Sequence, residues 1–251
     1  MQNKSNHSRK IILWIENNVP NEYNYKITKY ATICQFDFQN SCYQIINKSK
    51  YANINNINTD ITSSQYMTLT YYSDAVRLAL LYVHGGCWFD LDVFFLRNFD
   101  PIFSSFSDKI CVYQWESFNV PNNAIIISLQ PFSKALRLTI NLMIQRNKGF
   151  GFMIANMKYT LPCDLFVLPC SWFDSNWLHH NKLFRCPEKY QFDVFFKSTN
   201  GIECNFNNFF PGAFCYHWHN CWDVDIADDS PIRQLDLCVN AQLYAQTINV
   251  Q

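Results

Sequence analysis

The sequence predicts a single α/β domain with a mainly parallel central sheet flanked by helices. Three observations support this fold class. The chain has 251 residues, which suits one α/β domain with a substantial core. Short apolar runs typical of buried parallel strands alternate with segments of helical periodicity. No repeat, charge run or proline-rich tract interrupts the sequence, so we expect one domain over residues 1–251, with residues 1–9 flexible.

Composition and charge restrict the class of partner. Lys plus Arg and Asp plus Glu both number 20, so the net charge is zero and a nucleic acid is not an expected partner. The 11 cysteines are odd in number and lack a Cys-x-x-Cys spacing, which favours reduced thiols over a zinc ribbon. The aromatic content of 17% fits a Phe-rich core better than an array of sugar-stacking side chains.

The N-terminal segment bears on location. It is polar over its first ten residues and continues with five apolar residues, too few for a signal sequence or a transmembrane anchor. We therefore expect a cytoplasmic protein without a transmembrane segment. Peripheral association with a membrane or with a viral factory stays open.

One stretch, residues 73–92, carries most of the functional information. A helix is predicted to begin with Ser73 as its N-cap and Asp74 in its first turn, where a negative charge suits the helix dipole. Its apolar face repeats at i, i+4 and i+7, through Val76, Leu80 and Val83. Gly85 and Gly86 favour a left-handed C-cap, so the helix is expected to end there.

A β-branched and aromatic strand over residues 87–94 is predicted to follow the glycines. Asp90 and Asp92 would point to one face of this strand, with their Cα atoms roughly 6 to 7 Å apart. Two carboxylates on one face repel each other and lose hydration unless a cation or several donors meet them. Asp90 and Asp92 are therefore candidate ligands of Mn²⁺ or Mg²⁺, which would carry the phosphates of a nucleotide. On the preceding helix, Asp74 and Arg77 lie at i, i+3 and can pair with each other or with sugar hydroxyls.

This composite motif resembles the signature of retaining glycosyltransferases that contain a DXD motif and have a GT-A fold. The matching pattern is Ser73-Asp74-x-x-Arg77, then Leu80, then Gly85-Gly86-x-x-x-Asp90-x-Asp92. The group includes initiating mannosyltransferases, α-1,4-galactosyltransferases and capsular polysaccharide sugar transferases, and it is related to the glucosyltransferase domains of clostridial toxins. The chain departs from the usual pattern at residues 87–89, where Trp88 replaces a Tyr, a change that we interpret as packing.

The resemblance implies an activity and roles for these residues. It implies transfer of a hexose, with retention, from a UDP- or GDP-sugar to a glycan, lipid or protein acceptor, with UDP-sugars favoured. Asp92 would be the direct ligand of Mn²⁺ or Mg²⁺, and Asp90 would contact the metal, its bound water, the ribose or the donor sugar. The remaining assignments are Asp74 and Arg77 as residues that orient the sugar, and Gly85 and Gly86 as part of the nucleotide-sugar site.

Two further candidates lie in predicted strands. Trp14, in a strand over residues 10–16, is either a core residue or a platform on which the base stacks. Asn123, in a strand over residues 120–128, matches a family position that lines the acceptor side. It would bond a sugar hydroxyl, although an Asx-turn at the start of the strand is an equally good interpretation.

The segment Pro211–Trp222 resembles the closing block of the same family, a short strand that ends in a His and is followed by a Trp. The resemblance implies that His217 completes the metal site, with His219 as the second choice. Asn220 and Trp222 would reach the β-phosphate through an amide and an indole N–H. Asp223-x-Asp225 is a second Asp-x-Asp, but no helix and glycine pair precede it, so we expect a solvated loop.

The other elements complete the expected order. They are strands over residues 31–38, 109–115 and 165–169, helices over residues 132–145 and 231–251, and a loop over residues 171–174.

Other functions also fit some of these residues. A nucleotide-sugar-binding module without turnover would explain the loss of the Gly-Pro motif that relatives have near residues 149–160. A metal-dependent phosphohydrolase or nucleotidyltransferase would use Asp90 and Asp92, but it leaves Asp74 and Arg77 unexplained. A third possibility is that the acids are structural and bonded to backbone N–H groups.

Overall fold

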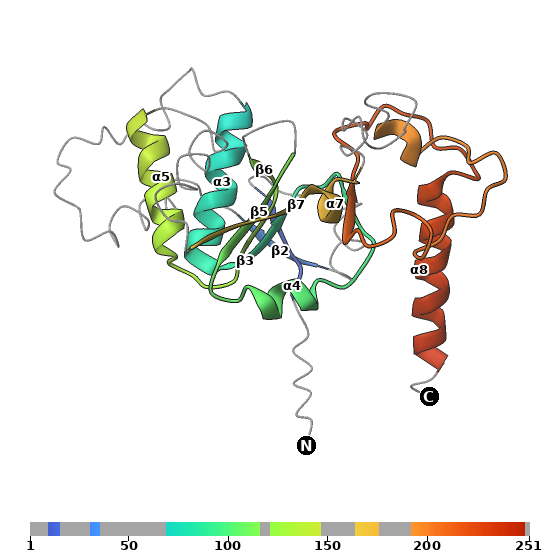
Figure 1. The fold of residues 1–251 in the computed structure, drawn as a ribbon, viewed down its shortest axis with the longest axis horizontal. Coiled ribbons are helices and arrows are strands. Elements are labelled where there is room, and N and C mark those ends of the chain that lie inside the picture. The colour runs from blue at the N-terminus through green and yellow to red at the C-terminus, as the bar shows by residue number, and fades with distance from the viewer. Residues whose placement is uncertain are drawn as a thin grey trace. The chain divides into compact units, whose positions relative to one another are not determined.

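The computed structural model describes residues 10–15, 31–35, 69–115, 121–146, 164–175 and 192–248 (Figure 1). The chain divides into two compact units, Met1–Ser64 and Gln65–Gln251. In the first unit, β1 (Ile12–Ile15) and β2 (Thr32–Gln35) form a parallel pair, which confirms two predicted strands. The expectation of one domain over the whole chain stays a prediction. Residues 1–9 lie outside the described residues.

The second unit is built on a four-stranded sheet with the order β3-β6-β5-β7. The strands are β3 (Gly86–Phe89), β6 (Pro121–Ser128), β5 (Ile110–Gln114) and β7 (Leu165–Pro169). β6 is antiparallel to β3 and β5, whereas β5 and β7 are parallel. The described sheet is therefore mixed, and a mainly parallel sheet is not confirmed. Only residues 115–120 connect β5 to β6, whereas neighbouring parallel strands need a crossover of a dozen or more residues, so these two strands pair antiparallel.

Two helices of this unit, α3 (Leu69–His84) and α5 (Lys134–Arg146), lie side by side (Figure 1). α3 also packs against β3 and β6, and both helices bury an apolar stripe that includes Leu78 and Leu136. α3 begins at Leu69, so the prediction of Ser73 as its N-cap is wrong. The Ser73 hydroxyl instead accepts a hydrogen bond from Arg77 (2.7 Å), because the helix already extends one turn before it.

The predicted strand over residues 87–94 is two strands, because its halves have different partners. β3 ends at Phe89 in the main sheet, whereas β4 (Val93–Phe95) pairs with β8 (Cys215–His217) in a separate antiparallel sheet. Asp90 still continues the β3–β6 hydrogen-bond ladder, since its N–H donates to the Ala124 carbonyl (2.8 Å). The Asp92 carbonyl accepts a hydrogen bond from Trp218 N–H (3.0 Å) and so belongs to the β4–β8 ladder. Asp90 and Asp92 therefore lie in the turn between two sheets, and their predicted place on one strand face is wrong.

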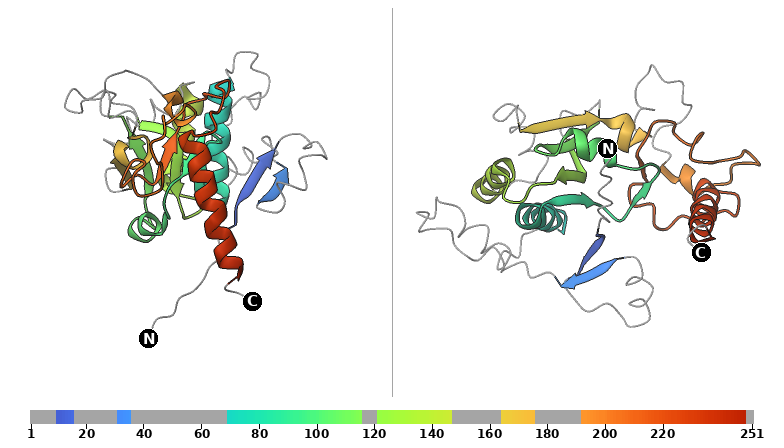
Figure 2. Two further views of the ribbon diagram at one scale, coloured as in Figure 1. Left: turned by 90° about the vertical axis from the view of Figure 1, so that its right-hand side faces the viewer. Right: turned by 90° about the horizontal axis from the view of Figure 1, so that it is seen from below.

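β8 separates two apolar clusters because successive side chains of a strand point to opposite sides. Cys215 belongs to the cluster that includes Tyr113 and Phe173. Tyr216 and Trp218 belong to an aromatic cluster that also includes Phe195, Phe196 and Leu235. Leu235 lies on α8 (Pro231–Ile248), the predicted C-terminal helix, which stands apart from the main sheet in Figure 2.

Short helices complete the described part of the chain: α4 (Asp100–Ser105), α7 (Cys170–Phe173) and the 3-10 helix η3 (Phe192–Phe195). α7 replaces the predicted loop over residues 171–174, and Asp174 follows it directly. Of the helices described, none is both long and apolar enough to cross a membrane.

Of the glycines that the structure describes in the second unit, Gly85 is expected to be the most sensitive to substitution. Its φ is +67°, and a Cβ there would lie 2.6 Å from the Leu129 carbonyl oxygen and 2.9 Å from Pro131 N. Left-handed strain and the backbone clash should together destabilise Gly85→Ala by roughly 2 to 5 kcal/mol in urea unfolding. Gly201→Ala is the matched control, since Gly201 has φ +81° but open space around it. Equal losses in the two variants would show that the close approach at Gly85 has no energetic consequence.

Candidate active site

Arg77 is the centre of a cluster formed by α3, β6 and the turn after β3. It is 5% exposed, and its Nη1 donates to Asp90 Oδ2 (3.2 Å) and to the Asn123 carbonyl (2.7 Å). Its Nε lies 3.7 Å from Asp74 Oδ1, which also accepts a hydrogen bond from Asn123 Nδ2. The structure thus brings together the four residues for which sugar contacts or catalytic roles were predicted, Asp74, Arg77, Asp90 and Asn123. Their contacts with a sugar stay a prediction.

Asp90 is held by the protein on both carboxylate oxygens. Trp88 Nε1 donates to Oδ1 (2.6 Å), and Arg77 donates to Oδ2. The Arg77 guanidinium also lies over the Trp88 ring, 5.5 Å from its centroid. Burial raises the pKa of Asp90, and the Arg77 charge and the Trp88 hydrogen bond offset that rise only in part. Trp88, interpreted from the sequence as packing, therefore also positions the Asp90 carboxylate.

Asp92 faces His217 across the second sheet. Val93 pairs with His217 in the β4–β8 register, so the preceding residue lies beside the imidazole, with Asp92 Oδ2 at 3.2 Å from His217 Nε2. The same oxygen accepts a hydrogen bond from Asn220 N–H (2.9 Å). Burial alone would raise the pKa of Asp92, but the hydrogen bond and charge of His217 and the Asn220 N–H together lower it. Asp92 is therefore an ionised, buried carboxylate.

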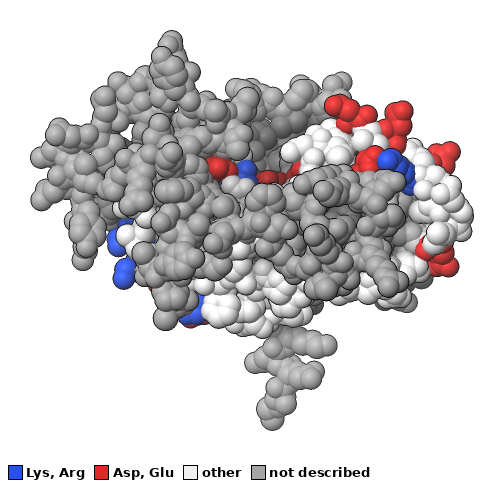
Figure 3. Space-filling model, turned by 45° about the horizontal axis from the view of Figure 1, so that its top comes forward, with Lys and Arg blue, Asp and Glu red and all other residues white. Residues whose placement is uncertain are grey.

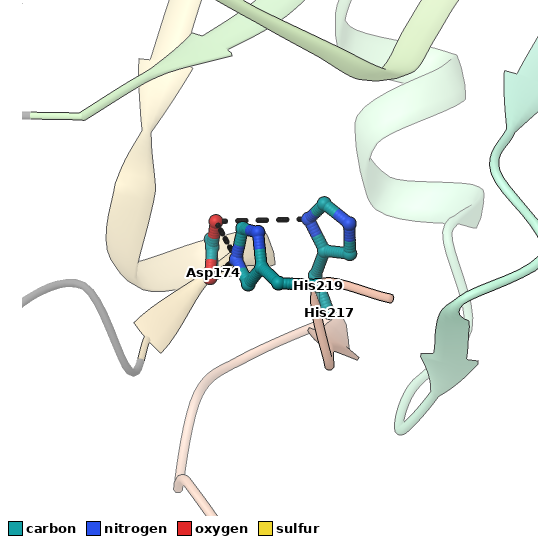
Figure 4. Close-up of side chains that lie close together, drawn as sticks. All are labelled: Asp174, His217 and His219. Carbon is teal, nitrogen blue, oxygen red and sulfur yellow. Dashed lines mark hydrogen bonds and ion pairs between the residues drawn. The ribbon is translucent and has the colours of Figure 1, made fainter. Parts of the chain in front are cut away.

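Asp174 lies on the other side of His217 and was missed by the sequence analysis (Figure 4). Its side chain is fully buried, and its carboxylate lies 3.7 Å from His217 Nδ1 and 2.9 Å from His219 Nε2. The ligand atoms of these three residues all lie within 4.8 Å of one another. A signal did exist, because an Asp five residues after a predicted buried strand, within an apolar and aromatic segment, is unusual.

His217 lies between the two carboxylates. Burial alone would lower the pKa of His217, but its hydrogen bonds and charge interactions with Asp174 and Asp92 raise the pKa to about 9. The metal-free protein therefore holds an imidazolium at neutral pH, flanked by carboxylates whose pKa values are lowered.

This shift predicts that the metal-free protein loses stability as pH rises. Because the pKa of His217 is higher in the folded than in the unfolded chain, its contribution is present below pH 6.5 and is lost as pH rises through about 9. Between pH 6.5 and 8.5 the free energy of unfolding should fall by about 2 kcal/mol. Urea unfolding with a chelator would measure this, and His217→Gln should remove that part of the pH dependence. A His217→Gln variant with an unchanged slope would contradict the assignment.

The remaining predicted site residues have mixed outcomes. Trp222 is 57% exposed, and its indole N–H donates to Asn220 Oδ1 (3.2 Å), so the two predicted phosphate-binding groups bond each other here. Gly85 and Gly86 have φ of +67° and +103° and end α3 as predicted, while their contact with a nucleotide sugar stays untested. Trp14 lies in the first unit, and its predicted contact with the base also stays untested.

The donor set at Asp92 and His217 suits a divalent cation. A carboxylate oxygen and an imidazole nitrogen 3.2 Å apart can be neighbouring ligands of one ion, and this pair suits Mn²⁺. His219 offers a second choice, in a set with Asp174 and the other nitrogen of His217. In Figure 3, a few acidic and basic side chains lie next to each other near the middle of the view. By contrast, the second pair, Asp223 and Asp225, is exposed, as predicted.

Comparison with known families agrees with this site. Residues 3–107 match the model of the glycosyltransferase sugar-binding region containing a DXD motif, a range that includes α3 and the turn with Asp90 and Asp92. The match supports a DXD-containing glycosyltransferase family and a glycosyltransferase-type role. No curated protein matches the chain significantly.

Proposed function

We propose that this protein is a metal-dependent glycosyltransferase that moves a hexose from a nucleotide diphosphate sugar to a glycan, lipid or protein acceptor with retention. UDP-sugars are the favoured donors. One observation carries the proposal: the turn Asp90-Leu91-Asp92 places a carboxylate held by Arg77 two residues from a carboxylate held by His217. The family match over residues 3–107 supports the same class of reaction.

Asp92 and His217 would hold Mn²⁺ or Mg²⁺ in this proposal. When bound, the ion supplies positive charge that stabilises the diphosphate leaving group. Asn220 fixes Asp92 through its backbone N–H, and the close β4–β8 register keeps His217 opposite. Asp90 retains lone pairs after bonding Arg77 and Trp88, so it can accept hydrogen bonds from the donor sugar, the ribose or a metal-bound water.

Arg77, Asp74 and Asn123 would recognise the sugar. Their carboxylate, guanidinium and amide groups supply both acceptors and donors, which is what the hydroxyls of a polyol need. Arg77 contacts the Asp74 carboxylate and donates to the Asn123 backbone carbonyl, and the Asn123 side chain in turn donates to Asp74. A preorganised cluster of this kind loses little conformational entropy when the sugar binds.

The experiment that tests this function is hydrolysis of a panel of UDP- and GDP-sugars with and without Mn²⁺. Release of free nucleotide from one donor, dependent on the metal, would support the transferase and identify the donor. Binding of a nucleotide sugar without hydrolysis, even with candidate acceptors, would favour a binding module. Release of phosphate from a nucleotide without sugar transfer would indicate a phosphohydrolase, and no binding of any nucleotide sugar would contradict the proposal.

A further inference from the structure

Asp174 is a fully buried carboxylate that the proposed chemistry does not use directly. Trp115 Nε1 donates to its Oδ2 (2.8 Å), and so does the Tyr113 hydroxyl (3.3 Å). Burying an ionised carboxylate is costly unless donors and opposite charges meet it, and an apolar side chain would stabilise a fold at least as well. The presence of a charge at this depth therefore points to an effect on its neighbours.

A hydrogen-bond chain connects Asp174 to His217 through Tyr113. The Tyr113 hydroxyl lies 3.3 Å from Asp174 Oδ2 and 3.1 Å from His217 Nδ1. An ionised carboxylate can only accept, so the hydroxyl donates to Asp174 and its oxygen accepts from the Nδ1–H of His217. Burial and the Asp174 charge raise the pKa of Tyr113 well above its usual value, which keeps the hydroxyl protonated.

His219 restrains the same imidazole from one face. Its ring stacks on that of His217 with centroids 3.8 Å apart, and its Nε2 bonds both oxygens of Asp174 at 3.0 and 2.9 Å (Figure 4). Asp174 thus contacts one side of His217 through Tyr113 and one face through His219. The opposite nitrogen, Nε2, is the one that faces Asp92.

We propose that Asp174 is a positioning residue for the metal site: when an ion takes the place of the Nε2 proton of His217, Asp174 with Tyr113 keeps the remaining proton on Nδ1 and so directs the Nε2 lone pair to the ion beside Asp92. This role rests on the proposed function, since it concerns the ion assigned to Asp92 and His217. Carboxylates that accept from the second nitrogen of a metal-binding His fix its tautomer and ring orientation in the same way.

The competing arrangement makes Asp174, His217 Nδ1 and His219 the ligands themselves. The distances favour the positioning role. Asp174 Oδ2 already accepts from Trp115 and Tyr113, and His217 Nδ1 lies closer to the Tyr113 hydroxyl (3.1 Å) than to Asp174 (3.7 Å).

The test measures Mn²⁺ binding by electron paramagnetic resonance in the whole 251-residue chain, with and without UDP. Asp174→Asn should weaken Mn²⁺ binding by about 10- to 100-fold, and Tyr113→Phe should weaken it by less. Asp229→Asn is the control, because the Asp229 carboxylate likewise accepts side-chain hydrogen bonds, from Ser198 and Thr199, but lies outside the site. In the wild type with diamagnetic Mg²⁺, ¹⁵N spectra should show His217 protonated at Nδ1.

Each other outcome overturns a distinct claim. Normal Mn²⁺ binding by Asp174→Asn and Tyr113→Phe, together with lost binding in Asp92→Asn, would leave the metal site intact and refute the positioning role. A His217 ring protonated at Nε2, with His219→Gln as damaging as His217→Gln, would identify the competing ligand set. Absence of Mn²⁺ binding by the wild type would overturn the metal site of the proposed function, and the role of Asp174 with it. The ¹⁵N spectra use only the wild type, so the proposal stays testable even if Asp174→Asn fails to fold.

Discussion

Asp92→Asn is expected to lower nucleotide-sugar hydrolysis by about 100-fold or more, because it removes a charge that holds the ion stabilising the leaving diphosphate. The fold should persist, since the Asn side-chain oxygen can still accept the Asn220 N–H and Asp174 still faces His217. Steady-state rates at increasing Mn²⁺ would measure the effect, and we expect the Mn²⁺ requirement to rise along with the loss of rate.

The chain offers a matched control for this variant in its second Asp-x-Asp. Asp225→Asn removes the same charge from an exposed side chain, so its rate should match that of the wild type. Thermal melting of both variants separates the two interpretations of Asp92. If Asp92→Asn melts far below the wild type and its rate falls only with the folded fraction, the carboxylate is structural and the metal assignment is wrong.

Arg77→Met is expected to cause the largest loss of stability, roughly 3 to 5 kcal/mol in urea unfolding. The substitution leaves the buried Asp74 and the partly buried Asp90 without the guanidinium that pairs with both of them. Arg77→Lys should lie between the wild type and Arg77→Met, because an ammonium keeps the charge but cannot reach both acids and the Asn123 carbonyl at once. Activity should fall in both variants.

Two comparisons test this explanation. Combining Arg77→Met with Asp90→Asn should recover part of the lost stability, since one unpaired charge becomes neutral. Arg233→Met, on an exposed position of α8, should stay within about 0.5 kcal/mol of the wild type. If the loss of unfolding free energy in the double variant equals the sum of the losses in Arg77→Met and Asp90→Asn, the Arg77–Asp90 pair does not account for the effect.

Much of the fold could be predicted because local patterns determine it. The strands at Ile110–Gln114, Pro121–Ser128 and Leu165–Pro169 match expected apolar runs, and the glycine pair ends α3 as its left-handed φ values require. The strand order could not be predicted in this way. Residues 87–94 are apolar enough for one continuous strand, and no local signal showed that β3 and β4 pair with partners in different sheets.

The candidate site was predictable where its residues are close in sequence. Asp74, Arg77 and Asp90 lie within one short motif, and the structure places them in contact. Asp174 was missed because its neighbours, Tyr113 and His217, are distant along the chain and meet only through the parallel pairing of β5 with β7 and the return of β8. A contact set by such long-range pairing has no signature in local spacing.

The alternation of side chains along β8 has a consequence for how the protein opens. His217 faces Asp92, while Tyr216 and Trp218 pack into the aromatic cluster with Leu235 of α8. A local opening that detaches α8 would expose those aromatic side chains and release the strand that carries the histidine. We therefore expect the backbone amides of β8 and α8 to exchange as one unit, so that an ion bound at Asp92 and His217 would slow hydrogen exchange in α8, which contributes no ligand to the ion.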